Sequence, residues 1–125
     1  MNLNQVTVPA LDVAASVDFY RRLGLELIVS SQHYARFKSP VGEASFSVHL
    51  VAELAAAPVT VVYFEVEALD ARVAELERAG LNFSQQPRDE PWLWREARLS
   101  DPAGNVICLY RAGGDRLDPP WRVKD

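Results

Sequence analysis

The sequence predicts an α+β fold built from two copies of one βαβββ unit. The segment 35–42 reappears at 97–104, with four of eight positions identical after a shift of 62 residues. Ahead of each copy, an Ala-Leu-Asp triplet, at 10–12 and again at 68–70, opens a helical stretch that ends at a glycine. A unit this small cannot bury a core alone, so we expect both copies to form one domain over residues 1–125.

Apolar periodicity orders the elements of the first copy, residues 3–52. An alternating strand is expected at 3–8, with its valines on one face and its polar residues on the other. A helix then runs from a candidate N-cap, Asp12, to a stop at Gly24. Three more strands are expected, at 25–30, 33–38 and 44–51.

The second copy, residues 59–110, repeats this order. A β-branched and aromatic strand at 59–66 precedes a helix capped by Asp70 and stopped by Gly80. Further strands are expected at 81–86, 93–99 and 105–110. With both helices on the outer side, the two mixed sheets are expected to curve around a cavity.

Two segments lie outside the copies. Residues 53–58 are rich in alanine, end in proline, and are the expected linker. The tail, 111–125, has no clear regular structure in its pattern, and we expect it to strap the cavity or a partner subunit, or else to lie in solvent.

Composition favours a soluble, cytoplasmic domain. The apolar content of 49% is too high for a disordered chain, and a net charge of −4 gives no reason to expect nucleic acid or an anionic membrane. No apolar stretch approaches the roughly 18 residues of a membrane span, and the first residues lack the pattern of a signal peptide. A single cysteine, Cys108, excludes an internal disulfide.

Three segments carry a resemblance to a known family: 11–27, 63–83 and above all 99–110, a D-P-x-G-N turn followed by an apolar strand. Together they resemble the vicinal oxygen chelate superfamily, which includes glyoxalase I, bleomycin-resistance proteins, fosfomycin-resistance enzymes and extradiol dioxygenases. The resemblance covers 3–110 and implies the fold and a homodimer. It does not imply the chemistry, because the superfamily holds both catalysts and binders.

Metal-using members of this superfamily take one ligand from the first strand of each unit and one from the last. By this resemblance Gln5 falls on the first position. Alternation places His49 on the cavity face and Phe46 under the helix, whereas an ungapped count from Gly42 would put Phe46 at the ligand position. We favour alternation, because burying a histidine under a helix costs more than lengthening a turn.

The second copy offers a poorer ligand set. Val61 stands at its first position and cannot coordinate, and Cys108 stands where relatives carry glutamate. Gln5, His49 and Cys108 together match oxygen-rich sites badly. We therefore expect no cofactor, with a divalent ion (Ni, Mn, Fe or Zn) as the alternative. Over metal binding we favour His49 as a polar residue at the cavity wall or a subunit contact, and Cys108 as a small packed hydrophobe.

Two tryptophans, Trp92 and Trp94, give the best positive indication of a ligand. At i and i+2 they share one face of an extended chain and suit stacking on a flat apolar or cationic molecule. The resemblance agrees, since bleomycin-resistance proteins hold their ligand in an aromatic groove between subunits. The alternative is a core or dimer contact. Five other residues complete the predicted ligand-binding set: Thr7, Ser47, Tyr63, Arg98 and Tyr110.

The favoured function is metal-independent sequestration of an aromatic or amphipathic small molecule by a homodimer. The alternative is a glyoxalase-like lyase or dioxygenase-like enzyme with an ion on Gln5 and His49. A third reading is a metal-free catalyst with Glu65 as the base, since alternation puts this carboxylate on the Tyr63 face. Over this role we favour Glu65 in a solvated pair with Arg36 or Arg98.

Overall fold

The computed structural model describes residues 3–56 and 60–122 and has the expected α+β fold. Two βαβββ units each form a four-stranded mixed sheet with one helix. The first compact unit comprises the chain up to Thr60 together with Ser100–Val106, and the second comprises Val61–Leu99 and the chain from Ile107 onward. Neither helix of the described ranges is long and apolar enough to cross a membrane.

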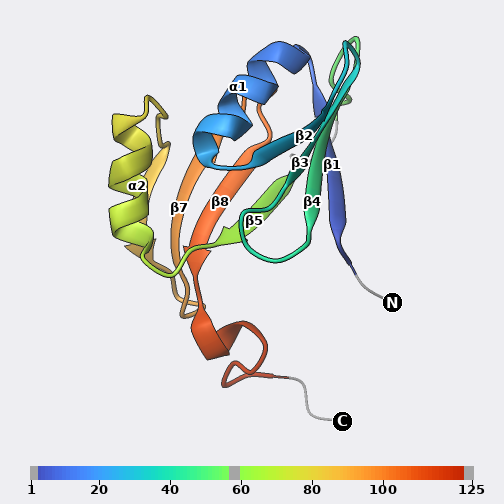
Figure 1. Ribbon diagram of the computed structural model, residues 1–125. Helices are drawn as coiled ribbons and strands as arrows, with labels where there is room; N and C mark the ends of the chain where they lie inside the picture. Colours follow the sequence, from blue (N-terminus) through green and yellow to red (C-terminus); the bar gives the residue numbers. More distant parts are fainter. Residues whose placement is uncertain (1–2, 57–59, 123–125) are drawn as a thin grey trace. The chain divides into compact units, whose positions relative to one another are not determined.

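The first unit follows the predicted order closely (Figure 1). Its sheet has the strand order β1-β4-β3-β2, in which β1 runs parallel to β4 and the other neighbours are antiparallel. Helix α1 contacts β2, β3 and β4 and so covers one face of the sheet. The elements are β1 (Gln5–Ala10), α1 (Val13–Leu23), β2 (Glu26–Ser30), β3 (Tyr34–Lys38) and β4 (Ser45–Leu50).

Both predicted ends of α1 are confirmed. Asp12 is the N-cap, and its side chain accepts a 3.0 Å hydrogen bond from the backbone N–H of Ala15. Gly24 ends the helix with a φ of 112°, a left-handed conformation that glycine adopts without steric cost.

Aromatic side chains form the core between α1 and its sheet. The ring of Tyr20 lies 4.6 Å from that of Phe46 and 5.6 Å from that of Phe37, measured between centroids. The Phe46 ring contacts Tyr20 of α1 and Val48 is buried, whereas His49 is exposed, so the alternate residues of β4 face away from the helix. The alternation argument for this strand is therefore confirmed.

The D-P-x-G-N turn belongs to the first unit, where its aspartate is a hub of hydrogen bonds. One oxygen of Asp101 accepts from the backbone N–H groups of Ala103 and Asn105, at 3.0 and 2.8 Å. The other accepts from the Tyr20 hydroxyl at 2.6 Å and from the Asn105 amide at 2.7 Å. That amide also donates to the carbonyl of Pro9 at 2.9 Å. The motif thus fixes the turn itself and holds it to α1 and β1.

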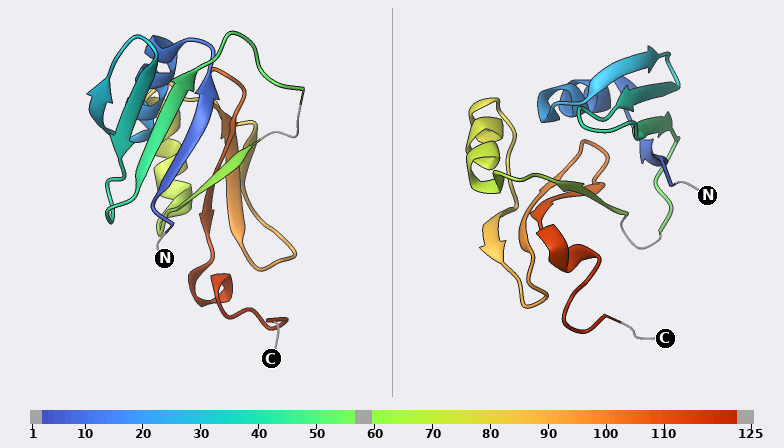
Figure 2. Two further views of the ribbon diagram at one scale, coloured as in Figure 1. Left: turned by 90° about the vertical axis from the view of Figure 1, so that its right-hand side faces the viewer. Right: turned by 60° about the horizontal axis from the view of Figure 1, so that its bottom comes forward.

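The second unit has the corresponding strand order, β5-β8-β7-β6 (Figure 2). Its helix contacts β6 and buries Leu69, Val73 and Leu76. The elements are β5 (Val61–Glu65), α2 (Leu69–Arg78), β6 (Gln85–Asp89), β7 (Arg95–Ser100), β8 (Val106–Arg111) and a short 3₁₀ helix (Gly113–Arg116).

The predicted cap of α2 is wrong. The helix begins at Leu69, which is buried. Its N-cap is therefore Ala68, whose side chain makes no capping hydrogen bond. Asp70 therefore lies within the first turn, where its two oxygens accept from the Arg95 guanidinium at 2.9 Å each. Gly80 has a φ of 95° just beyond the helix, as its predicted stop requires.

The start of β6 and the structure of the tail also differ from the prediction. Strand β6 begins at Gln85 rather than 81, since Leu81 is buried directly after α2. The pairing of β6 with β7 is irregular between Gln85 and Arg88. The tail forms a 3₁₀ turn, which its glycine-rich pattern did not indicate. Residues 57–59, which include the end of the linker and the predicted start of β5, lie outside the described residues.

Candidate functional site

Each sheet has one face covered by its helix and one face that we call the helix-free face. On the first sheet, strand register places the helix-free side chains in rows. Thr7 pairs with Ser47 and Ser47 with Arg36, while Pro9 pairs with His49 and His49 with Tyr34. The third row contains Gln5, Ser45 and Lys38.

Hydrogen bonds join the polar side chains of this face. The hydroxyls of Thr7 and Ser47 lie 2.6 Å apart, and Ser47 is fully buried. Ser45 donates to the side-chain carbonyl of Gln5 at 2.8 Å. Two residues of the predicted ligand-binding set, Thr7 and Ser47, are thus direct neighbours.

An aromatic cluster lies on the helix-free face of the second sheet and comprises Tyr63, Trp94 and Tyr110. The rings of Trp94 and Tyr110 stack at a centroid distance of 4.6 Å with an interplanar angle of 20°. Tyr63 meets both edge-on, at 6.0 Å from Trp94 and 5.7 Å from Tyr110. Tyr63 remains 44% exposed, so part of the cluster is open to a ligand.

A buried carboxylate borders this cluster. Glu96 is 1% exposed, and its oxygens accept from the Trp92 indole N–H at 2.6 Å and from Arg98 at 3.2 Å. Arg98 also donates to the Tyr63 hydroxyl at 3.4 Å. The network links three predicted ligand residues through Glu96, which the sequence analysis did not single out. Its signal was the alternation of Trp94, Glu96 and Arg98 along one strand face.

The extended chain expected at the two tryptophans is wrong. Leu93 lies between them with a φ of 71° and donates its backbone N–H to the carbonyl of Glu90, so the segment is a hairpin turn. Trp94 reaches the aromatic cluster, whereas Trp92 bonds to Glu96 from the turn and remains 42% exposed.

Glu65 has partners that neither of its expected pairings included. One of its oxygens accepts from the backbone N–H groups of Ala112 and Gly113, at 3.0 and 3.1 Å. The other lies 3.7 Å from Arg116. The expected pair with Arg36 or Arg98 is therefore wrong, and the carboxylate anchors the start of the tail.

Comparison with known proteins agrees with this fold. A model of the Glyoxalase/Bleomycin resistance protein/Dioxygenase superfamily matches residues 2–109. The chain belongs to this superfamily. No curated protein matches the sequence closely enough to count as a relative.

Three solved structures resemble most or nearly all of the chain. A glyoxalase/bleomycin resistance protein/dioxygenase from Nocardioides is 20% identical, with a TM-score of 0.80 over 99% of this chain and 90% of its own. Lactoylglutathione lyase from Agrobacterium tumefaciens is 18% identical, with a TM-score of 0.75 over 92% and 95%. A bleomycin-binding protein complexed with bleomycin is 16% identical, with a TM-score of 0.71 over 89% and 98%. At these identities the likeness shows the fold alone.

The donor pair expected from the metal-using members of the superfamily does not form in the first unit. Gln5 pairs with Ser45, whereas His49 pairs with Pro9, four residues farther along β1. At about 3.3 Å per residue, this offset separates Gln5 and His49 by about 13 Å along the strands. Two ligands of one ion lie within about 5 Å of each other. The strand register thus does not bring the two residues together, although both lie on the helix-free face.

Cys108, the third expected donor, is fully buried in the second unit. Burial, and then the nearby carboxylate of Glu96, raise the pKa of its thiol to about 12. A thiol binds metal as the thiolate, so these surroundings oppose coordination. Across the described residues, no three His, Cys, Asp or Glu side chains are grouped to hold an ion. The residues present thus do not fit the superfamily's metal.

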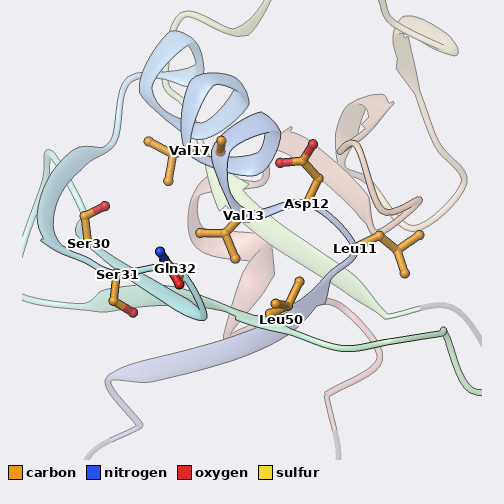
Figure 3. Close-up of a pocket in the computed structure, with 9 residues that line it drawn as sticks. Leu11, Asp12, Val13, Val17, Ser30, Ser31, Gln32 and Leu50 are labelled. Atoms are coloured by element: carbon orange, nitrogen blue, oxygen red, sulfur yellow. The ribbon is translucent and has the colours of Figure 1, made fainter.

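A pocket of about 570 Å³ lies elsewhere in the first unit, beside the start of α1 (Figure 3). Val13 and Val17 of α1 and Leu50 of β4 form its apolar wall, and Gln32 lies in the β2–β3 turn beside it. Asp12, its one charged lining residue, is already the N-cap of the helix. None of the predicted site residues lines this pocket.

Proposed function

We propose that the chain binds a small, flat, largely apolar molecule against the aromatic cluster, without a metal ion. The observation that carries the proposal is the partly exposed trio of Tyr63, Trp94 and Tyr110. Aromatic rings prefer offset-stacked or edge-to-face contacts, which contribute about 0.5–1.5 kcal/mol beyond the burial of area. Tyr63 is 44% exposed, so part of this side chain is accessible to a further ring.

The surroundings of the cluster also support this proposal. Glu96 orients Trp92 and Arg98 through hydrogen bonds of 2.6 and 3.2 Å, so polar groups at the border of the cluster are held in place. Binding sites combine an apolar wall with a few fixed polar groups in this way. A relative of the same fold forms a complex with bleomycin, which makes a small-molecule ligand a reasonable expectation for this chain.

The metal-dependent alternative has weaker support. Gln5 and His49 are four residues out of register, and Cys108 is a buried thiol with a raised pKa. A lyase or dioxygenase of the superfamily's metal-using kind would require a different donor set.

We also propose a homodimer, as the family resemblance implies, and light scattering of the purified protein tests it.

The experiment is a thermal-shift screen of planar aromatic compounds, bleomycin included, in buffer treated with a chelator. Bound compounds raise the melting temperature by mass action. Calorimetry then gives the Kd of each hit for the wild type, for Trp94→Ala, and for Trp121→Ala as a control in the exposed tail. We expect at least about tenfold weaker binding in Trp94→Ala, or about 1.4 kcal/mol, and no change in the control.

The proposal is wrong if hits bind equally well to Trp94→Ala and Tyr63→Ala, or only after a divalent ion is added. Trp94→Phe keeps a ring at the stacking position. It should bind with an affinity between those of the wild type and Trp94→Ala, which separates loss of the ligand contact from loss of folding.

A further inference from the structure

Arg36 lies in the middle row of the helix-free face of the first sheet. Strand register puts Ser47 directly beside it, with Thr7 beyond Ser47 on β1. The Nε of Arg36 donates to the hydroxyl oxygen of Tyr34 at 2.9 Å, and the guanidinium carbon lies 5.5 Å from the Tyr34 ring centroid. A neutral side chain therefore orients this guanidinium.

The charge of Arg36 is not neutralised within the described part of the chain. A guanidinium carries five N–H groups, and the recorded bond to Tyr34 uses the one on Nε. No carboxylate lies within ion-pair distance of Arg36 among the described residues. Strands β1, β3 and β4 contain no acidic residue, and Glu26 of β2 lies in the row of Lys38.

The second copy of the repeat provides an internal comparison. The shift of 62 residues that relates the copies carries Arg36 onto Arg98 and Tyr34 onto Glu96. Arg98 lies 3.2 Å from the Glu96 carboxylate, which is 1% exposed. One copy thus uses its arginine for an internal ion pair, whereas the other pairs its arginine with a phenol and keeps the charge available.

We propose that Arg36, held in place by Tyr34, binds an oxyanion, the carboxylate or phosphate group of a small molecule. A guanidinium donates two parallel N–H bonds to such a group. The Thr7 and Ser47 hydroxyls in the same row bond to each other, 2.6 Å apart, so the guanidinium is the donor at this site. This site is on the first sheet and is independent of the proposed function on the second.

The surroundings of Tyr34 agree with this assignment. A hydrogen bond from Ser47, and then one from Arg36, lower the pKa of the Tyr34 hydroxyl. Both donors thus fix the Tyr34 oxygen, and with it the phenol that orients Arg36.

Acetate and phosphate are the probes, titrated separately into the full-length protein and followed by NMR at constant ionic strength, with chloride as the reference salt. We expect saturable shifts of the Arg36 side-chain Nε–H and of the Ser47 and Thr7 amides. Saturation by acetate indicates a planar carboxylate, and saturation by phosphate a tetrahedral anion; either supports the proposal.

The decisive variants are Arg36→Gln and Tyr34→Glu, the second of which copies the arrangement of the other repeat. Both should weaken anion binding at least tenfold, because one removes the charge and the other neutralises it. Arg21→Gln, an exposed arginine in the last turn of α1, is the matched control and should bind as the wild type does. Dispersed amide spectra confirm that each variant is folded.

Unsaturable shifts that chloride reproduces would overturn the proposal, as would unchanged binding in Tyr34→Glu. Neither result affects the aromatic cluster, whose ligand is measured with Trp94→Ala on the other sheet. The failures of the two proposals are therefore distinguishable.

Discussion

The Tyr20 hydroxyl donates a 2.6 Å hydrogen bond to the Asp101 carboxylate in the interior of the first unit. Tyr20 is fully buried and Asp101 is 5% exposed. Burial, and then the Asp101 carboxylate, raise the pKa of Tyr20, so the phenol stays protonated and remains the donor. The D-P-x-G-N motif, which carries the family resemblance most strongly, therefore acts in the structure of this chain as a folding element.

Tyr20→Phe removes that donor and leaves the rest of the aromatic core in place. A hydrogen bond to a buried charged group contributes about 1.5–3 kcal/mol, so we expect the free energy of unfolding to fall by about 2 kcal/mol. Urea denaturation measures the change. Tyr34→Phe, which removes a hydroxyl from a half-buried position, should cost less than about 1 kcal/mol. Equal losses in the two variants would contradict the role given to Asp101.

Glu96→Gln tests the buried network beside the aromatic cluster. The substitution keeps the shape and removes the charge that accepts from Trp92 and Arg98. We expect a loss of about 2 kcal/mol in the free energy of unfolding. Glu75→Gln, in an exposed pair with Arg72 on α2, should change it by less than about 1 kcal/mol. A Glu96 variant as stable as this control would show that the network contributes nothing to folding.

The buried thiol of Cys108 predicts a dependence of stability on pH. Its folded-state pKa of about 12 lies above the ordinary value of about 8.5, so the unfolded chain loses the proton first as pH rises. This contribution is complete below about pH 8 and is lost between about pH 9 and 12. Between pH 8 and 10.5, the free energy of unfolding should therefore fall more for the wild type than for Cys108→Ala. Urea denaturation at each pH measures both. Parallel losses would mean that the thiol is not the titrating group.

Glu65 predicts the behaviour of the tail. Its carboxylate accepts from two backbone N–H groups at the start of the 3₁₀ helix, so Glu65→Ala should release the segment that follows. We expect faster trypsin cleavage after Arg116, with the melting temperature of the remaining protein nearly unchanged. Glu67→Ala, at an exposed position beyond the end of β5, is the control. Cleavage at the wild-type rate would show that the tail is held by other contacts.

Most of the fold could be predicted because its signals are local. The Asp12 cap, the Gly24 stop and the alternation in β4 each involve neighbouring residues, and each is confirmed. The start of β6 could not be predicted in this way. Leu81 reads as a strand residue by its apolar side chain, but it packs directly after α2 and the ladder begins only at Gln85.

The candidate site was predicted less completely, because it depends on pairing between distant strands. Alternation put His49 on the correct face but could not give its register, and the register separates it from Gln5. Alternation likewise did not indicate that Glu96 is buried and accepts hydrogen bonds from Trp92 and Arg98. The Leu93 turn was also missed, because a positive φ at leucine has no signature in the sequence.

The most direct test is a crystal structure of the protein with a compound from the thermal-shift screen, grown from chelator-treated solution. We expect an aromatic ring of that compound in contact with Tyr63 and Trp94, and no cation on Gln5 or His49. A compound seated instead in the pocket beside Val13, or a coordinated ion on Gln5 or His49, would contradict this expectation.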